Sequence, residues 1–451
     1  MPTEREKGRQ VTEVAACRSP RPFRPESGGV SRSIWEFDMT SIRNSGERRP
    51  HPAPASGEDI LGNRQDFSLV VGGPLYQLLR RAHLSDDVLL LVQQRILFIS
   101  ALAWLPLLLL SAFEGSLLSK DGRLPFLTDI EVHLRFLVAV PLLLAAEPVV
   151  HQRLRGIAKS FLERNLIPKD AMDQFDAAIG AAFHLRNSVF AEALLVVIVY
   201  VVGVLVVWRH YTALQAATWY ALPSEGHSNL SLAGMWYGYI SLPLFQFLLL
   251  RWYFRLFIWM RFLWQVSRIR LSLIPTHPDR VGGLGFLANT VYAFALILCA
   301  HGVMAAANLG NRILFLGSSL PEFKAEIGVM VIFLLAVVFG PLMVFAPQLA
   351  QAKRKGLNEY GTLAERYVRD FDTKWLRGGA AADESFLGSG DIQSLADLGN
   401  SFEVVRGMRL APITRDAILQ LAAAVSIPLV PLALTMMPLS ELVKYLFALI
   451  F

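Results

Sequence analysis

Seven long apolar stretches, separated by polar connections, set the pattern of this sequence. A membrane-spanning helix needs about 20 apolar residues to cross roughly 30 Å of hydrocarbon. The pattern therefore predicts an all-α polytopic membrane protein with about seven spans in a transmembrane domain over residues 89–451. The expected spans cover residues 96–113, 131–150, 189–208, 236–258, 284–307, 327–346 and 418–437. Pro428 and Pro431 leave open whether residues 418–451 cross once or re-enter.

Two polar connections, residues 151–188 and 350–417, are long enough to form a layer of cytosolic helices. In the first, Pro168 is typical of a helix start. In the second, apolar residues recur at helical spacing until Gly378, which ends the predicted helix. Two shorter helices are expected to follow it, Asp391–Leu398 and Ser401–Met408. The apolar stripe consists of Leu357, Tyr360, Leu363, Tyr367, Phe371 and Trp375.

The N-terminal region has a different character. Residues 1–64 are rich in Arg, Pro and Ser and show no periodicity, which predicts a disordered tail. Met39 is an alternative start to Met1. Residues 65–88 contain a short amphipathic stretch that suits an interfacial helix on an anionic membrane surface.

The basic residues fall mainly in alternate connections. The connections after the second, fourth and sixth spans, together with Arg251 and Arg255 at the end of the fourth span, carry 22 Lys and Arg residues, whereas the opposite connections and the C-terminal tail carry 6. Under the positive-inside rule, the richer side faces the cytosol. The N-terminus is then cytosolic as well.

Composition excludes an ordinary soluble protein. The apolar residue types make up 53% of the chain, charged residues only 18%, and the mean hydropathy is +0.42. The expected partner is therefore the lipid bilayer and not nucleic acid, despite a net charge of +6. The two cysteines, Cys17 and Cys299, give no disulfide framework or metal motif, so no metal and no cofactor is expected.

The densest local motif runs from Pro275 to Leu287, immediately before the fifth span. Its glycines allow tight turns that expose backbone amides at a helix N-terminus, beside a basic side chain, and this arrangement suits an anion such as phosphate, a carboxylate or a lipid headgroup. The candidate binding residues are His277, Asp279, Arg280, Gly282, Gly283 and Gly285. The alternative is a plain turn in which Asp279 caps the fifth span. A dinucleotide fingerprint is excluded because no strand precedes the glycines.

Ionisable residues inside or beside the spans form a second candidate site. Glu147, Glu192, Arg251 and Arg255 are all expected at the cytosolic ends of their helices. Charges at this depth are costly unless they are paired or hydrated. They predict either a static ion-pair network or a water-filled vestibule for ions.

Three further residues near the outer ends of spans suggest ordinary roles. His133 and Arg135 are expected to reach the lipid headgroups. His301 is expected to be packed or hydrogen-bonded, since no second metal ligand stands at a suitable spacing.

Three stretches resemble a family of uncharacterised polytopic inner-membrane proteins of Gram-negative bacteria. They begin at Gln65 (QDFSLVVGGPLYQLLRRAH), Pro275 (PTHPDRVGGLGFL) and Asp391 (DIQSLADLGNSFEVVR). The likeness covers roughly residue 65 to the C-terminus. It implies a bacterial inner-membrane location and no particular chemistry.

Three functions remain open from the sequence. The favoured one is a transporter or channel for a small anionic solute, admitted past Arg251, Arg255 and Arg280. The second is a sensor or scaffold whose residues 350–417 contact a soluble partner or a second copy. The third is a membrane enzyme acting on a phosphorylated lipid. The chain has no recognised catalytic motif, which favours a non-enzymatic role.

Overall fold

The computed structural model describes residues 67–70, 72, 92–118, 124–208, 218–224, 227–381 and 383–436. All of them belong to one compact unit, Ser56–Phe451. The predicted disordered tail and most of the predicted interfacial segment lie outside the described residues, as do both alternative starts and residues 437–451.

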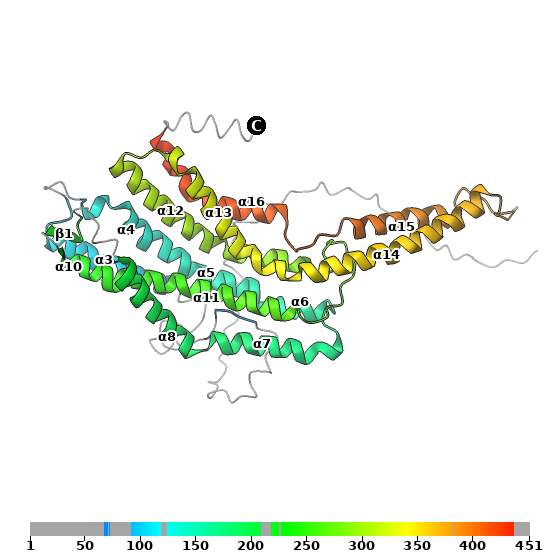
Figure 1. Cartoon of the computed structure of the whole chain (residues 1–451), viewed down its shortest axis with the longest axis horizontal. Helices are drawn as coiled ribbons and strands as arrows, with labels where there is room; N and C mark the ends of the chain where they lie inside the picture. Colours follow the sequence, from blue (N-terminus) through cyan, green and yellow to red (C-terminus); the bar gives the residue numbers. More distant parts are fainter. Residues whose placement is uncertain are drawn as a thin grey trace, which may run out of the picture. The chain divides into compact units, whose positions relative to one another are not determined.

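Most of the described residues are helical (Figure 1). The strands among them are β1 (Ala221–Ser224) and β2 (His227–Leu230), which form one short antiparallel hairpin. The helices are α3 (Val92–Phe113), α4 (Ile130–Leu134), α5 (Val140–Arg155), α6 (Ile157–Glu163), α7 (Met172–Arg186), α8 (Val189–Ile198), α10 (Leu232–Trp236), α11 (Leu242–Val266), α12 (Ala295–Leu316), α13 (Lys324–Phe339), α14 (Ala346–Phe371), α15 (Gly390–Arg406) and α16 (Arg415–Ser426).

Six helical runs among the described residues are long and apolar enough to cross a membrane. A seventh is reached if Lys169–Arg186 and Val189–Leu205, which meet at a 48° bend, count as one span. The all-helical character expected from the sequence is therefore confirmed, with six or seven long apolar helices that suggest a multi-pass membrane protein. The six runs are Val92–Phe113, Ile130–Glu163, Leu232–Val266, Leu284–Phe315, Leu320–Leu376 and Arg415–Thr435.

Prolines mark where these runs change helical type. Pro141, Pro243 and Pro341 each lie in the first turn of a new helical segment. Proline has no amide hydrogen to donate and is tolerated best at such positions. The segments preceding α5 and α11, Arg135–Ala139 and Tyr237–Ser241, are π-helical.

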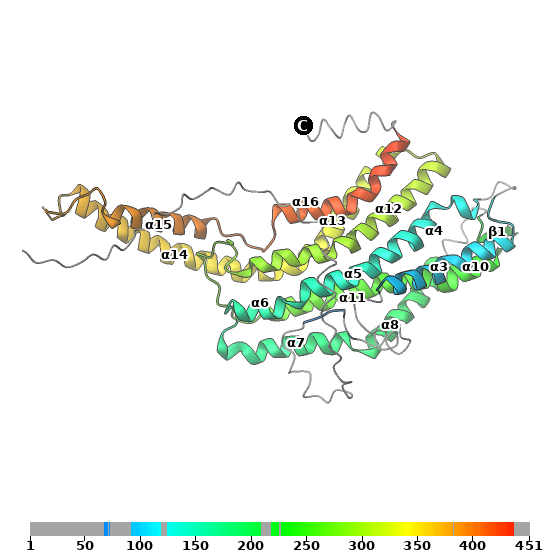
Figure 2. The same cartoon turned by 180° about the vertical axis from the view of Figure 1, so that it is seen from behind.

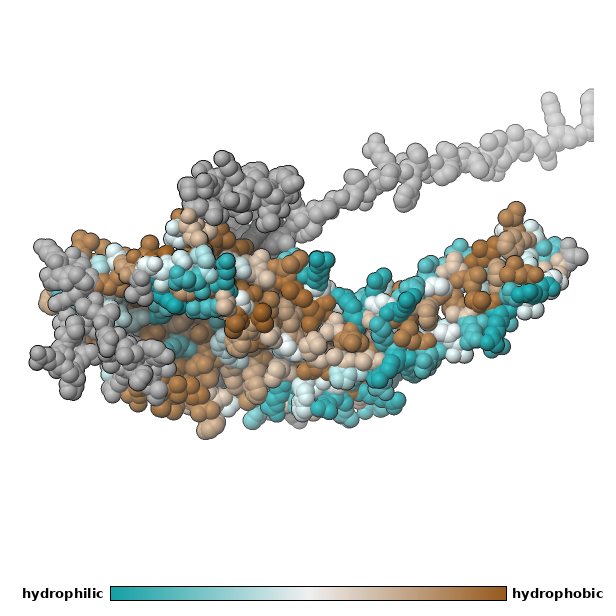
Figure 3. Space-filling model, turned by 45° about the horizontal axis from the view of Figure 1, so that its top comes forward, coloured by the Kyte–Doolittle hydropathy of each residue, from teal (hydrophilic) through white to brown (hydrophobic). Residues whose placement is uncertain are grey.

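The outer surface of the bundle is strongly apolar. Large side chains on α3, α8 and α13 are exposed, among them Phe113 at 83%, Phe190 at 78% and Ile332 at 69%. Figure 3 shows hydrophobic side chains over much of the bundle, whereas hydrophilic ones gather over α14 and α15. Exposed apolar surface of this extent is expected where lipid replaces water as the solvent.

The polar connections separate into two ends. The helices of the two long connections that are rich in Lys and Arg, α6, α7, α14 and α15, lie at one end, and β1 lies at the other (Figures 1 and 2). We call these the basic end and the opposite end. The helices α7 and α11 pack side by side, as do α12 and α16.

Residues 67–70 differ from their expected interfacial position. Their side chains are buried, with Phe67 only 1% exposed. The ring of Phe67 lies 4.6 Å from that of Phe262 and 5.8 Å from that of Phe183, measured between centroids. This part of the predicted interfacial segment therefore packs between helices, because its Phe and Leu side chains find an apolar site there.

The hairpin at the basic end also departs from expectation in one element. The predicted helix up to Gly378 is confirmed, and this glycine has a left-handed φ of +77°. The two short helices expected after it are instead one helix, α15, which runs through Gly399. A glycine inside a helix costs only about 1 kcal/mol. Packing against α14, with hydrogen bonds from Tyr367 and Trp375 to Asp391, offsets this cost.

Close contact between α12 and α16 depends on Gly302. A Cβ at this position would lie 2.1 Å from the carbonyl oxygen of Val425. We expect Gly302→Ala to destabilise the folded chain by about 1–3 kcal/mol, because the two helices must separate. Thermal unfolding in detergent measures this, with Gly328→Ala as the control, since Gly328 on α13 has no neighbour within 4 Å. Equal unfolding temperatures for the two variants would contradict the role of Gly302.

Candidate functional site

The structure brings the four predicted intramembrane charges together around Glu147. One carboxylate oxygen, Oε1, lies 2.9 Å from Nη2 of Arg255 and 3.4 Å from Nη1 of Arg251. The other guanidinium nitrogen of Arg251, Nη2, lies 3.6 Å from Oε1 of Glu192. Four residues from α5, α8 and α11 thus form one ion-pair network.

A fifth member, Arg95, was not among the predicted residues. It donates a hydrogen bond to Oε2 of Glu147, the oxygen that the α11 arginines leave free. Arg95 immediately precedes the first expected span, so its position suggested an ordinary basic flank. No signal in the sequence distinguishes it from the basic flank of an ordinary span.

All five side chains of this network are shielded from solvent. The side chain of Glu147 is 7% exposed, and those of Arg95, Arg251, Arg255 and Glu192 range from 5% to 13%. Removing ions from water costs several kcal/mol each, so such charges persist only with close partners. We call these five residues the Glu147 cluster.

Local structure fixes the arginines of α11. Arg251 and Arg255 are four residues apart and therefore share one face of the helix. The indole of Trp252 donates to the carbonyl of Leu143 on α5 at 2.9 Å, which sets the register of the two helices. The guanidinium of Arg255 lies over the same indole, 4.6 Å from the ring centroid. Glu192 lies in the first turn of α8, after the N-cap Ser188.

The predicted anion loop is organised around its own carboxylate. Asp279 accepts hydrogen bonds from the backbone amides of Val281, Gly283 and Gly285, at 2.8, 3.2 and 2.8 Å. Its Oδ1 also lies 2.9 Å from Nδ1 of His277. The amides that were candidates for an external anion therefore hold Asp279, which is the geometry expected of the turn alternative.

The remaining candidates shape this loop. Arg280, Gly282 and Gly283 have left-handed φ values of +57°, +66° and +99°. Gly285 has no room for a side chain, since a Cβ would lie 2.8 Å from Oδ2 of Asp279. The side chain of Arg280 is exposed.

The loop also joins the bundle to the α14–α15 hairpin. Arg409, which follows α15, donates from its amide to the carbonyl of Arg280 at 2.7 Å and from Nη2 to the carbonyl of Asp279 at 3.1 Å. On α14, a Cβ at Gly356 would lie 2.6 Å from Pro275. The loop is therefore a packed junction between three parts of the chain.

At the opposite end, the position of Arg135 differs from the expectation that its side chain reaches the lipid headgroups. It is buried and donates to the hydroxyl of Tyr237 and to Glu131. His133 likewise accepts from the indole of Trp104 at 3.0 Å. Both side chains turn inward because the π-helical segment and the aromatic residues nearby provide hydrogen-bond partners within the bundle.

His301 is hydrogen-bonded, as expected. Its Nε2 lies 2.7 Å from the hydroxyl of Tyr253 and its Nδ1 lies 2.7 Å from the carbonyl of Ile297. Within the described ranges, no group of three or more His, Cys, Asp or Glu residues is arranged to hold a metal ion.

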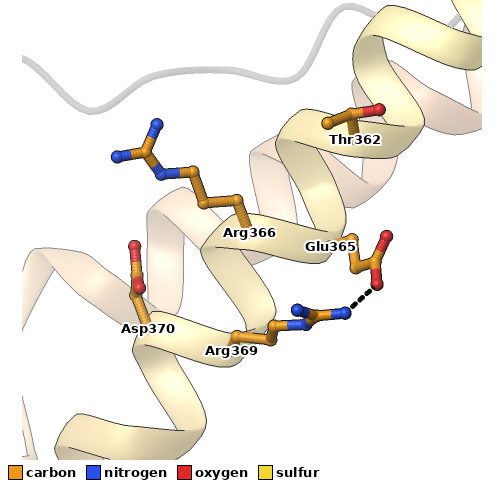
Figure 4. A pocket seen from close by; sticks show the side chains of 5 residues that line it. All are labelled: Thr362, Glu365, Arg366, Arg369 and Asp370. Atoms are coloured by element: carbon orange, nitrogen blue, oxygen red, sulfur yellow. Dashed lines mark hydrogen bonds and ion pairs between the residues drawn. The ribbon is translucent and has the colours of Figure 1, made fainter.

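A hollow on α14 offers a less suitable site. It measures about 200 Å³ and is lined by Thr362, Glu365, Arg366, Arg369 and Asp370 (Figure 4). All five residues come from one exposed helix face, and Glu365 and Arg369 pair with each other. Such a face resembles a solvated ion-pair surface more than a binding site.

Comparisons with protein-family models, with curated proteins and with solved structures find no match to this chain. The family resemblance of the three sequence stretches therefore stays a prediction.

The Glu147 cluster should depend strongly on its central carboxylate. We expect Glu147→Gln to lower the free energy of unfolding by about 3–5 kcal/mol, because it leaves buried arginines without their counter-ion. Chemical denaturation in detergent measures the change. Glu163→Gln is the control, since Glu163 pairs with Lys159 at an exposed position and should change stability by less than about 0.5 kcal/mol. A similar small effect of both substitutions would contradict the cluster's role.

The loop carboxylate predicts a pH dependence. Burial raises the pKa of Asp279, but the amides of Val281, Gly285 and Gly283 and the His277 ring together outweigh it, so the pKa lies below its ordinary value. The stabilisation is therefore present above about pH 4, the unfolded-state value, and is lost as the pH falls through the lower folded-state value. In denaturation at pH 7 and pH 3, the stability deficit of Asp279→Asn relative to wild type should be smaller at pH 3 than at pH 7, because wild type loses part of this stabilisation below about pH 4.

The control for this pH experiment is Asp383→Asn, which changes an exposed carboxylate on the turn before α15. The free energy of unfolding of this variant should equal that of wild type at both pH values. A deficit of Asp279→Asn that stays constant with pH would contradict the role of the ionised carboxylate.

Proposed function

We propose that this chain is a multi-pass protein of the bacterial inner membrane that transports a small anionic solute. Its basic end faces the cytosol in this proposal, together with the N-terminus. The apolar surface of the bundle supports the membrane location. The distribution of Lys and Arg residues supports the orientation under the positive-inside rule.

The observation that carries the proposal is the convergence of three buried guanidiniums on one carboxylate. Arg95 comes from α3 and Arg251 and Arg255 come from α11, whereas Glu147 belongs to α5. Ionisable residues within apolar helices are costly and commonly mark ion or substrate pathways. Arginine is suited to binding an anionic solute, because the planar set of N–H donors on its guanidinium matches the oxygens of carboxylates and phosphates.

The depth of the cluster supports a role at the cytosolic entrance. Arg95 directly precedes Ile96, the first residue of the apolar part of α3. The cluster therefore lies where hydrocarbon would begin on the basic side. Exposed Arg280 belongs to the same end of the bundle and would raise the local concentration of anions.

Flux measurements test the proposal directly. The full chain is reconstituted in proteoliposomes, and uptake of acetate, chloride and phosphate is measured. We expect uptake of at least one of these anions, and we expect Arg255→Gln to reduce it about tenfold or more, because a buried contact to the solute is lost.

Two further variants make the flux result interpretable. Arg261→Gln alters an exposed arginine on the same helix and should leave uptake unchanged. Arg255→Lys keeps the charge and guards against a misfolded glutamine variant; it should retain part of the uptake. Absence of uptake for all three anions, or full uptake by Arg255→Gln, would overturn the proposal.

A further inference from the structure

We infer that the Glu147 side chain is a tethered stand-in for the transported anion, and that the solute class is a small monocarboxylate of about the size of acetate. This inference rests on the proposed function, because it names the solute for the same site. It goes further by treating Glu147 as an exchangeable occupant of an arginine site and not as a fixed structural counter-ion.

The hydrogen bonds define a site for two oxygens of one planar group. Arg95 contacts Oε2, and Arg251 and Arg255 both contact Oε1. The donors therefore approach the carboxylate from two helices, α3 and α11, neither of which carries Glu147. A free carboxylate in the same position would meet the same donors on both of its oxygens.

Burial restricts the size of an occupant. Glu147 is 5% exposed, and its neighbours on α5, Leu143, Leu144 and Ala146, are each at most 2% exposed. Relative to alanine, the glutamate side chain adds one methylene and one carboxylate, and these are the heavy atoms of acetate. A site packed around that group has no spare volume for a much larger anion.

The backbone at Glu147 is suited to movement of its side chain. The next residue is Pro148, which lies inside α5 and has no amide hydrogen. The helical hydrogen bond that residue 148 would donate to the carbonyl of Leu144 is therefore missing. This weakens α5 at the point where the tethered carboxylate must leave the arginines for a solute to enter.

A rescue experiment tests the inference without requiring transport. Glu147→Ala should unfold at a lower temperature than wild type in detergent, since it leaves the arginines without their counter-ion. Acetate should then raise the unfolding temperature of this variant by several degrees, because a ligand that binds only the folded state stabilises it. Chloride at equal ionic strength and neutral acetamide should give much smaller shifts.

The matched control is Glu192→Ala. The carboxylate of Glu192 lies 3.6 Å from Arg251, and its removal leaves Glu147 in place on the three guanidiniums. This variant should therefore not gain an acetate site, and acetate should raise its unfolding temperature no more than chloride does. Equal effects of acetate, chloride and acetamide on Glu147→Ala would overturn the inference.

If Glu147→Ala cannot be produced as folded protein, a second variant tests the same inference. Glu147→Gln keeps the size of the side chain but removes its charge, so acetate should displace the amide and stabilise this variant more than chloride does. If acetate and chloride stabilise Glu147→Gln equally, the inference is overturned. Rescue by acetate with no anion flux would instead refute transport alone, whereas flux without rescue would refute only the carboxylate stand-in.

Discussion

The ion pairs of Glu147 are the constraint on which the helical bundle depends. Three guanidiniums approach one carboxylate in a region that is almost closed to solvent. Each charge would be costly alone, and the pairs form only if α3, α5 and α11 keep one relative register. The hydrogen bond from Trp252 to Leu143 fixes that register on one side. In this part of the molecule, the packing of the helices therefore also determines whether the buried charges are compensated.

Hydropathy predicted the helices well because lipid and core both select apolar residues. It failed where the partner of a segment, and not its own composition, decides its position. Phe67 belongs to a short segment that the sequence predicts to be interfacial, but its side chain is buried against Phe262. Gly399 reads as a helix end, but α15 continues through it along α14. In both cases a tertiary contact, which a single sequence does not contain, outweighs the local preference.

The candidate site was predictable in part for a similar reason. Glu147, Arg251 and Arg255 lie within apolar runs, where a charge is conspicuous. Arg95 lies at the edge of such a run and resembles the basic flank of any span, so its inward direction could not be foreseen. Arg135 shows the opposite error, since a charge near a span end was expected to reach the surface but instead bonds Tyr237 inside the bundle.

Two carboxylates occupy the two positions where the sequence suggested an anion, and their surroundings differ in kind. Asp279 is held by backbone amides of the three nearby residues Val281, Gly283 and Gly285. These donors are part of the turn itself, so releasing the carboxylate would unfold the loop. Glu147 is held instead by side chains from two other helices, α3 and α11. In the proposed function, an anion that replaces the Glu147 carboxylate would keep the three guanidiniums compensated, and the ion pairs between the helices would remain. The amides that hold Asp279 belong to its own turn, and for this reason we place the proposed anion site at the Glu147 cluster and not at the glycine loop.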